Sequence, residues 1–205
     1  MHKKNIVFAG KQPAAGGKVL IMIHGRGGSA EDILSLAGHL NIQGFSLVAP
    51  KATNNAWYPF SFMAPEGNNE PWLSSAISLL LETITDLETK GIHPADIYFL
   101  GFSQGACLTL EFVARNAKQY GGVIAFTGGL IGETINEAKY GGDFKGMPVF
   151  IGSSDPDAHV PVERVYESEK LLKQLNANVN VKIYKGMGHT INTDEIEEAV
   201  KILGK

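Results

Sequence analysis

The sequence has only one cysteine, no long hydrophobic run and no excess of positive charge. The single cysteine among the 205 residues, Cys107, excludes a disulfide framework and a metal site built from cysteines. No apolar run reaches the roughly 18 residues that a membrane-spanning helix requires, and we expect residues 1–6 to lead into a strand and not to form a signal peptide. The net charge of −3 provides no basic surface for nucleic acid or an anionic membrane. We therefore expect a cytoplasmic protein that has no membrane span, no nucleic-acid partner and no bound metal.

Glycine, in contrast, is abundant, with 24 residues among 205. This share exceeds the usual ~7%, and many of these glycines follow apolar runs. Hydrophobic residues make up 44% of the chain and charged residues 19%, which is typical of a globular protein and not of a disordered one. The length fits one domain that covers residues 1–205.

Short apolar runs alternate with helical patterns along the chain. The runs predict strands over residues 6–8, 19–23, 45–49, 97–100, 122–126, 148–151 and 179–184. Most of them are continuously apolar, which is typical of parallel strands buried on both faces, whereas the last one alternates like an edge strand. Helical spacing predicts helices over residues 29–40, 73–90, 103–117, 162–175 and 193–203. This alternation predicts a three-layer α/β fold with a mostly parallel sheet and helices on both faces.

The strongest motif is Gly101-Phe-Ser-Gln-Gly105, which lies between a predicted strand and a predicted helix. A G-x-S-x-G sequence in this context is typical of a nucleophile elbow, a sharp turn that lifts the serine hydroxyl above the sheet. The two glycines leave room for the neighbouring backbone. Ser103 is therefore the candidate nucleophile, and the helix N-terminus beneath it favours developing negative charge.

A serine nucleophile requires a base and an acid, which follow the serine in this type of fold. His189 comes directly after the last predicted strand, where a loop can carry its imidazole over the edge of the sheet. His159 lies too close to the candidate acids to act as the base, and we expect it at the rim of a pocket. Asp155 and Asp157 both follow the strand at 148–151, and spacing alone does not separate them as the acid that orients His189.

The glycine-rich stretch from Gly25 to Gly28 has two interpretations. It follows a strand, so one of its backbone N–H groups and that of Gln104 would form an oxyanion hole. The stretch Gly25-Arg-Gly-Gly-Ser-Ala30 also fits the G-x-G-x-x-A fingerprint of dinucleotide-binding proteins. That fingerprint needs a carboxylate about 20 residues further on, whereas Lys51 stands at the end of the next strand and would suit only a 2′-phosphate.

Together these residues resemble the phospholipase/carboxylesterase family of small α/β-hydrolases, which includes the acyl-protein thioesterases. The matching stretches are Met22–Ser29, Trp57–Pro59 with Phe62, Leu100–Ala106, Asp157–Pro161 and Gly186–His189. The resemblance implies an α/β-hydrolase fold without a separate cap domain. It also implies that Asp157, and not Asp155, is the acid of the triad, because the family motif places the acid four residues before a proline.

The same resemblance implies roles for further residues. The oxyanion N–H groups would belong to Arg26 and Gln104. The loop that carries Trp57 and Tyr58 would form the wall of an acyl pocket. Phe62 from this loop and His159 at the rim are the other candidate substrate-binding residues.

The sequence thus predicts a serine carboxylesterase that hydrolyses small to medium carboxylic esters through an acyl-enzyme and needs no cofactor. The expected partner is a small-molecule ester, and a homodimer is left open. A lysophospholipase or acyl-thioesterase with the same triad is the nearest alternative. A non-catalytic module that binds a ligand or a dinucleotide is the remote one.

Overall fold

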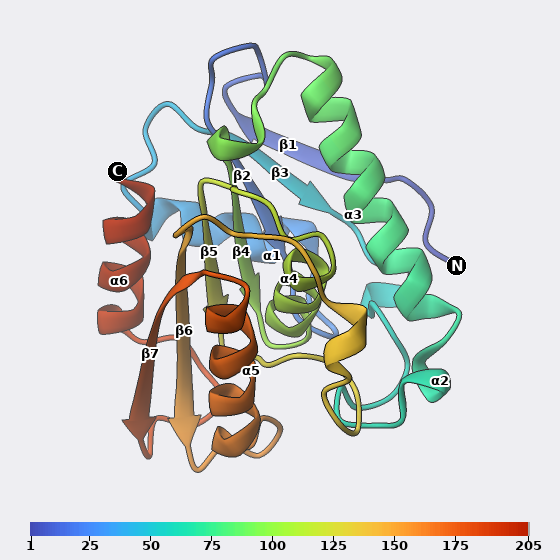
Figure 1. The fold of residues 1–205 in the computed structure, drawn as a ribbon. Coiled ribbons are helices and arrows are strands. Elements are labelled where there is room, and N and C mark those ends of the chain that lie inside the picture. Colours follow the sequence, from blue (N-terminus) through green and yellow to red (C-terminus); the bar gives the residue numbers. More distant parts are fainter. Residues whose placement is uncertain (205) are drawn as a thin grey trace.

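Seven strands form one sheet in the computed structural model, which describes residues 1–204 (Figure 1). The strands are β1 (Ile6–Gly10), β2 (Val19–Ile23), β3 (Ser46–Pro50), β4 (Ile97–Phe102), β5 (Gly122–Phe126), β6 (Pro148–Asp155) and β7 (Asn178–Lys185). Their spatial order is β1-β3-β2-β4-β5-β6-β7. Only β1 runs antiparallel to its neighbour, so the carboxyl ends of the other six strands meet at one edge.

Helices cover both faces of this sheet. They are α1 (Ala30–Ser35), α2 (Glu66–Asn69), α3 (Trp72–Thr89), α4 (Gln104–Arg115), α5 (Val162–Gln174) and α6 (Thr193–Leu203). Buried side chains of α3, α4 and α5 pack against one face, and those of α1 and α6 pack against the other. The predicted three-layer α/β fold is therefore confirmed.

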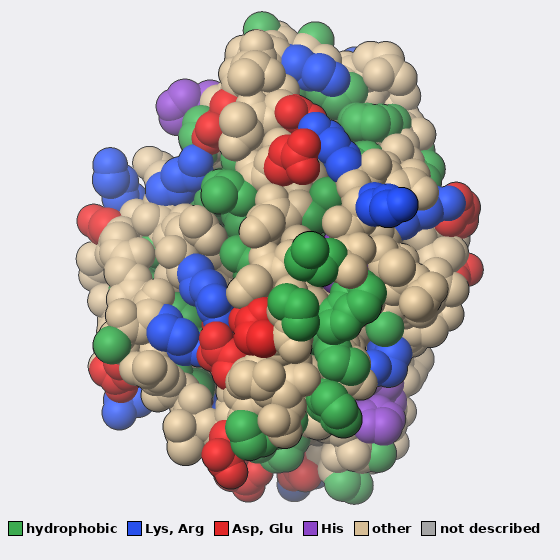
Figure 2. Space-filling model, turned by 90° about the vertical axis from the view of Figure 1, so that its right-hand side faces the viewer, with side chains coloured by type: hydrophobic (Ala, Val, Ile, Leu, Met, Phe, Trp, Pro, Cys, Tyr) green, Lys and Arg blue, Asp and Glu red, His purple; other side chains and the backbone are tan. Residues whose placement is uncertain are grey.

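The core is continuous through the central strands because their side chains are buried on both sides. In β2, Val19 and Ile21 contact the core beneath α3 and α4, whereas Leu20 and Met22 contact the core beneath α1 and α6. All four are fully buried. On the outer side of α3, Leu81 is 49% exposed, and hydrophobic side chains gather on that face of the molecule in Figure 2.

All seven predicted strands and all five predicted helices are present, with differences at their ends. The first helix stops at Ser35 and continues as a 3₁₀ turn, Leu36–His39, which contains the poor helix former Gly38. β6 extends to Asp155, four residues beyond the prediction, because its polar end pairs with β7 as far as Lys185. Sequence analysis did not predict the short helix α2 or the 3₁₀ turns Thr53–Asn55, Pro94–Asp96 and Glu137–Lys139.

A sharp turn joins β4 to α4 and places Ser103 above the carboxyl edge of the sheet. Ser103 has φ 54° and ψ −120°, a left-handed conformation that costs a non-glycine residue about 1–3 kcal/mol. Its N–H donates to Phe126 O at 2.9 Å, and Cys107 N–H donates to Ser103 O at 3.0 Å. These bonds hold the strained residue between the neighbouring strand and the new helix.

Two glycines make this turn possible, as the motif predicted. A Cβ on Gly105 would lie 2.1 Å from Ile23 O and 2.6 Å from His24 O, so α4 touches the backbone that follows β2. A Cβ on Gly101 would lie 2.4 Å from Gly105 O. Neither position has space for a side chain.

We predict that Gly105→Ala lowers the free energy of unfolding by about 3 kcal/mol or more. This is the upper end of the roughly 1–3 kcal/mol that overpacking costs, because the added methyl group meets rigid backbone. The matched control is Gly38→Ala, since a Cβ at Gly38 has no atom within 4 Å. Thermal unfolding should show Gly105→Ala melting ~5 °C or more below Gly38→Ala. Equal melting temperatures would contradict this account of the turn.

Candidate active site

Loops from several strands meet at the carboxyl edge of the sheet, which is the lower edge in Figure 1, where the arrowheads of β6 and β7 point. The turn after β2 contributes Arg26, and the elbow after β4 contributes Ser103. The loops after β6 and β7 contribute Asp157 and His189. Residues separated by up to 163 positions in the chain therefore come together because parallel strands end at the same edge.

Ser103, His189 and Asp157 form a continuous chain of hydrogen bonds. His189 Nε2 lies 2.8 Å from Ser103 Oγ, and His189 Nδ1 lies 2.9 Å from Asp157 Oδ2. A carboxylate only accepts hydrogen bonds, so the ring proton is on Nδ1, and Nδ1–H donates a hydrogen bond to Asp157. Nε2 then accepts a hydrogen bond from the hydroxyl of Ser103. This is the tautomer that a general base for Ser103 requires.

Asp157 is held as a charged carboxylate. Its side chain has no exposed surface, and its Oδ1 accepts the backbone N–H groups of His159 at 2.8 Å and Val160 at 2.9 Å. Burial by itself would raise the pKa of Asp157, but these N–H groups and the His189 imidazole outweigh it and lower the pKa. Asp157 therefore carries the negative charge that stabilises a protonated His189.

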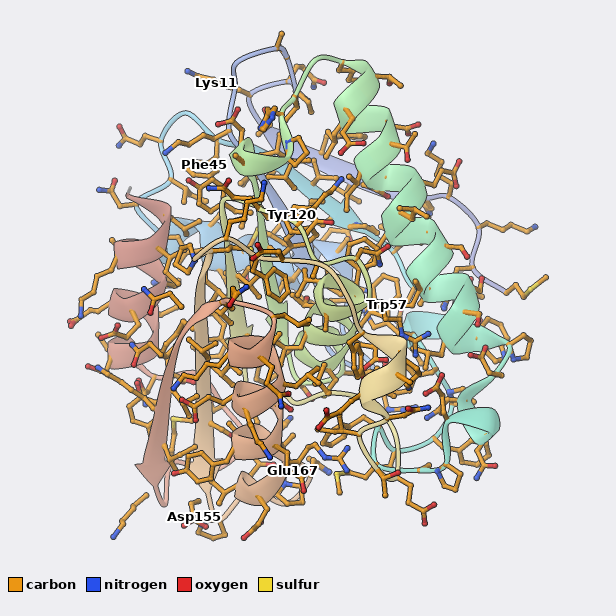
Figure 3. All side chains as sticks on the ribbon, viewed as in Figure 1. Lys11, Phe45, Trp57, Tyr120, Asp155 and Glu167 are labelled. Carbon is orange, nitrogen blue, oxygen red and sulfur yellow. The ribbon has the colours of Figure 1, made fainter. Side chains whose placement is uncertain are left out.

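Asp155, the other candidate acid, takes no part in this chain of hydrogen bonds. It is the last residue of β6 and is exposed at the bottom of the molecule in Figure 3. Its neighbour Ser154 serves the site instead, because Ser154 Oγ accepts the N–H of Gly188 at 2.9 Å and so fixes the loop that carries His189. Sequence analysis missed Ser154, which no motif distinguishes.

The rings of Phe102 and His159 flank the imidazole of His189. Their centroids lie 5.3 Å and 4.9 Å from that of His189, and the His159 ring is nearly perpendicular to it at 81°. His159 is exposed and lines the cavity, so the structure places it at the rim, where the sequence suggested. Both rings therefore pack beside the imidazole, whose orientation is set by its bonds to Asp157 and Ser103.

Arg26 and Gln104 line the cavity beside Ser103, and the backbone N–H of each is a candidate oxyanion donor. Gln104 N–H belongs to the first turn of α4, where helical N–H groups have no partner within the helix. In the turn after β2, Gly27 N–H donates to Asn55 O at 2.7 Å and Gly28 N–H donates to Gly25 O at 3.1 Å. Among residues 1–204, none accepts the N–H of Arg26. The predicted oxyanion residues therefore keep N–H groups available for a ligand.

A cavity of about 500 Å³ opens beside these groups. Its floor is made by the elbow and Cys107, and one wall is made by the loop after β3. The wall residues are Tyr58, Pro59, Phe60, Ser61 and Phe62. Tyr58 and Phe62 are buried and Phe60 is 55% exposed, so the wall is apolar in its depth and open at its mouth.

Trp57 does not belong to this wall, which corrects the expectation from the sequence. Its side chain is fully buried between α3 and α4 (Figure 3), and its Nε1–H donates to His24 O at 2.8 Å. The rings of His2 and His24 lie 5.5 Å and 5.0 Å from it. Trp57 therefore packs behind the wall and anchors it, while the next residue, Tyr58, lines the cavity.

Both histidines beside Trp57 are neutral and hold the same loop. His2 Nε2–H donates to Trp57 O at 2.9 Å, and its Nδ1 accepts the N–H of Thr53 at 3.1 Å. His24 Nδ1–H donates to Gly25 O at 2.8 Å, and its Nε2 accepts the N–H of Ala52 at 3.2 Å. Burial lowers the pKa of both imidazoles. Protonation would turn each accepting nitrogen into a donor and break its bond to the loop.

Comparison with known proteins decides the family. The sequence profile of the phospholipase/carboxylesterase family matches residues 2–205. The chain belongs to this family. A solved structure of a phospholipase/carboxylesterase from Dyadobacter fermentans is 50% identical, with a TM-score of 0.97, and the match covers 100% of this chain and 98% of that one.

Curated members of the family match more distantly. Acyl-protein thioesterase 1 of Kluyveromyces lactis is 28% identical over 65% of this chain and 60% of its own length. Acyl-protein thioesterase 1 of Saccharomyces cerevisiae is 30% identical over 64% of this chain and 59% of its own length. The matched stretch thus spans less than two thirds of either yeast protein.

The contacts of the glycine-rich turn, Gly25–Gly28, agree with membership of the phospholipase/carboxylesterase family. A Cβ on Gly25 would lie 3.3 Å from Phe102 O and 3.4 Å from Ser103 Cβ, so the turn packs on the elbow. Lys51, which the dinucleotide interpretation assigned to a 2′-phosphate, pairs with Glu31 at 2.6 Å. The turn therefore serves the serine site, and the dinucleotide interpretation is set aside.

Cys107 lies on the cavity floor but is not a second nucleophile. It is 1% exposed, and burial raises the pKa of its thiol to about 12. The reactive thiolate is therefore absent at neutral pH. Within residues 1–204, no cluster of three or more His, Cys, Asp or Glu side chains is arranged to hold a metal ion, and none of the helices has the length and apolarity to cross a membrane.

We predict that His2 makes the stability of the protein dependent on pH. Because burial lowers the pKa of His2 in the folded state, the unfolded chain binds its proton more readily below the ordinary value of about 6.5. The free energy of unfolding of wild type should therefore fall, relative to that of His2→Gln, as the pH drops from 7 to 5. The relative slope is at most ~1.4 kcal/mol per pH unit for one proton.

Urea unfolding of both proteins across this range measures the difference. Comparison with the variant cancels the other titrating groups, including Glu195, whose buried carboxyl has a pKa raised to about 7 and acts in the opposite direction. A difference in unfolding free energy that stays constant with pH would show that His2 does not titrate as described.

Proposed function

We propose that this protein is a serine carboxylesterase that hydrolyses small to medium carboxylic esters through an acyl-enzyme. The observation that supports this function best is the hydrogen-bond chain from Ser103 Oγ through His189 to Asp157, with distances of 2.8 Å and 2.9 Å. A serine, a neutral imidazole and a buried carboxylate in this order form the site of an activated nucleophile. Membership of the phospholipase/carboxylesterase family supports the same reaction class.

In the first half of the reaction, Ser103 Oγ attacks the ester carbonyl carbon while its proton moves to His189 Nε2. The carbonyl electron pair moves to the oxygen, and the N–H groups of Arg26 and Gln104 stabilise the resulting oxyanion. Collapse of this intermediate breaks the bond to the alcohol, which takes the proton from Nε2. Throughout, Asp157 fixes the ring and stabilises its positive charge.

In the second half, water repeats the attack on the acyl-enzyme. It gives one proton to His189 Nε2, and collapse of the second intermediate returns that proton to Ser103 Oγ and releases the carboxylic acid. No cofactor takes part in either half. Proton transfer depends only on the Nδ1-protonated tautomer that Asp157 imposes.

The cavity indicates the size of the acyl group. Its wall of Tyr58, Phe60 and Phe62 suits an apolar chain or an aromatic ring, and its volume of about 500 Å³ lies in the lower half of the range for ligand pockets, roughly 300–1,000 Å³. His159 at the rim, beside His189, would contact the leaving alcohol. The proposed partner is thus a small-molecule ester, and the reduced thiol of Cys107 suits a cytoplasmic location.

A thioester is the alternative substrate, because the same oxyanion site and base serve both bonds. The similarity of this chain to the acyl-protein thioesterases of K. lactis and S. cerevisiae supports this alternative. Parallel assays of p-nitrophenyl esters, acyl-thioesters and lysophospholipids, ranked by kcat/KM, decide among these substrates. The ester proposal requires the p-nitrophenyl esters to rank first.

We predict that Ser103→Ala, Asp157→Asn and His189→Ala each lower kcat for ester hydrolysis on the order of 10⁴-fold, because the three residues act as one unit. The matched control is Asp155→Asn, which removes a neighbouring exposed carboxylate and should leave kcat close to wild type. Steady-state rates on p-nitrophenyl butyrate measure both. An inactive Asp155→Asn beside an active Asp157→Asn would reverse the assignment of the acid.

We predict that Phe62→Ala enlarges the acyl pocket and raises the kcat/KM of longer acyl esters relative to acetate. Trp57→Phe is the control from the same loop, because Trp57 lies behind the wall and the change removes its bond to His24 O and part of its buried ring. It should lower the melting temperature and leave the acyl preference unchanged. If Trp57→Phe shifted the acyl preference and Phe62→Ala did not, the assignment of the wall would be wrong.

A further inference from the structure

The side chains of the two proposed oxyanion residues both bind the backbone of the cavity wall. Gln104 Oε1 accepts the N–H of Trp57 at 2.9 Å, and its Nε2 donates to Tyr58 O at 2.8 Å. Arg26 Nη1 donates to Pro59 O at 2.9 Å, and its Nη2 donates to Phe60 O at 2.7 Å. Four consecutive residues of the loop after β3, 57–60, are thus held by two side chains whose residues line the cavity beside Ser103.

The two side chains fit these roles in different ways. Gln104 is 6% exposed and both ends of its amide are satisfied, so its orientation is fixed by one donor and one acceptor on the wall. Arg26 is more exposed, but its planar guanidinium spans two successive carbonyls, a geometry that lysine does not reproduce. The guanidinium carbon also lies 6.0 Å from the centre of the Tyr58 ring.

The two halves of the proposed oxyanion hole differ in rigidity. Gln104 N–H is fixed by the elbow that joins β4 to α4, because Ser103 bonds to Phe126 O on one side and to Cys107 N–H on the other. Arg26 N–H lies in a turn with glycines at 25, 27 and 28, and Gly27 has φ +77° and no atom within 4 Å of an added Cβ. Glycine gives this turn many accessible conformations. The position of Arg26 N–H therefore depends on the bonds that restrain the turn. These are the bonds of Gly28 N–H to Gly25 O, of Gly27 N–H to Asn55 O and of the Arg26 side chain to the wall.

We propose that Arg26 is a positioning residue. Its side chain fixes its own backbone N–H in the oxyanion hole by hydrogen bonding to the acyl-pocket wall, and Gln104 bonds the same wall to the elbow. The wall is the bridge between the two donors, so the acyl group that fills the cavity and the oxyanion that forms beside it share one support. This inference rests on the proposed esterase function. It assigns the arginine side chain a role in turnover that is separate from contact with the substrate.

Arg26→Met tests this role, because it keeps the apolar stem and the backbone N–H but removes both bonds to the wall. With p-nitrophenyl acetate, whose short acyl group barely reaches the wall, kcat should fall about tenfold or more while KM changes little. The loss should stay below the 10²–10³-fold that follows removal of an oxyanion donor. Arg26→Lys should recover part of kcat, since one amine reaches one carbonyl. Gln104→Met, which frees the other end of the bridge, should lower kcat in the same way.

Asn69→Ala is the matched control for a loosened wall. Asn69 is fully buried and makes two bonds to the same loop, from Phe60 N–H at 2.9 Å and to Ser61 O at 2.9 Å, but it makes no direct bond to the oxyanion turn. It should lower the melting temperature and raise KM for longer acyl esters, but lower kcat for the acetate ester much less than Arg26→Met does, because both bonds of Arg26 to the wall remain.

Two results would overturn the inference. One is a wild-type kcat for acetate in a folded Arg26→Met variant. The other is an equal fall of kcat in Arg26→Met and Asn69→Ala, which would mean that Arg26 only stabilises the loop. Ester turnover by wild type and its loss in Ser103→Ala are measured first. If the proposed function is wrong, this first measurement fails. If only the present inference is wrong, wild type is active and the Arg26 variants do not behave as expected.

Discussion

The strained backbone of Ser103, packed against the end of β2 through Gly105, is the constraint on which the site depends. Because α4 begins where the backbone of Ile23 and His24 passes within contact of Gly105, the elbow fixes several groups at once. It places Ser103 Oγ within hydrogen-bond distance of His189, and it brings the Gln104 side chain to the backbone of Trp57 and Tyr58. A residue larger than glycine at 105 would separate α4 from β2, and with it the nucleophile from the turn that carries Arg26.

The loops around the elbow are stabilised mainly by bonds to one another, which explains how a site made of connecting segments can be rigid. The long segment after β5 takes part in this network. Gly132 N–H donates to Phe62 O at 2.7 Å, and the buried carboxylate of Glu111 in α4 accepts Ile131 N–H and Tyr140 O–H at 2.9 Å each. The segment thus supports the acyl wall from behind, and α4 supports the segment. Rigid catalytic groups of this kind need little reorganisation when charge develops.

The sequence was most informative where a motif combines a chemical requirement with a steric one. The two glycines around Ser103 and the position of His189 after the last strand were sufficient to predict the elbow and the base. The acid was less accessible, because β6 extends through polar residues to Asp155 and so changes the count from the strand end. Only the family pattern favoured Asp157, and the structure places that residue beside His189.

Predictions from composition alone were less reliable in the aromatic loop. An aromatic residue on a connecting loop is buried either in the body of the protein or in a cavity, and the sequence does not show which. Trp57 is buried in the body of the protein and Tyr58 lines the cavity, although the two residues are neighbours in the sequence. The hydrogen bonds of Arg26 to Pro59 O and Phe60 O could not be predicted from the sequence either, because every residue has a backbone carbonyl. Such contacts depend on how two loops approach each other in space.

The central claim is that Ser103 forms a covalent acyl-enzyme, and trapping that intermediate tests it most directly. Wild type mixed with p-nitrophenyl butyrate and quenched in acid within the first turnovers should carry one butyryl group, and peptide mass mapping should place it on Ser103. The second half of the proposed reaction predicts that this adduct disappears when the substrate is exhausted. Sustained ester turnover with no adduct on Ser103, or with the butyryl group on Cys107, would contradict the account.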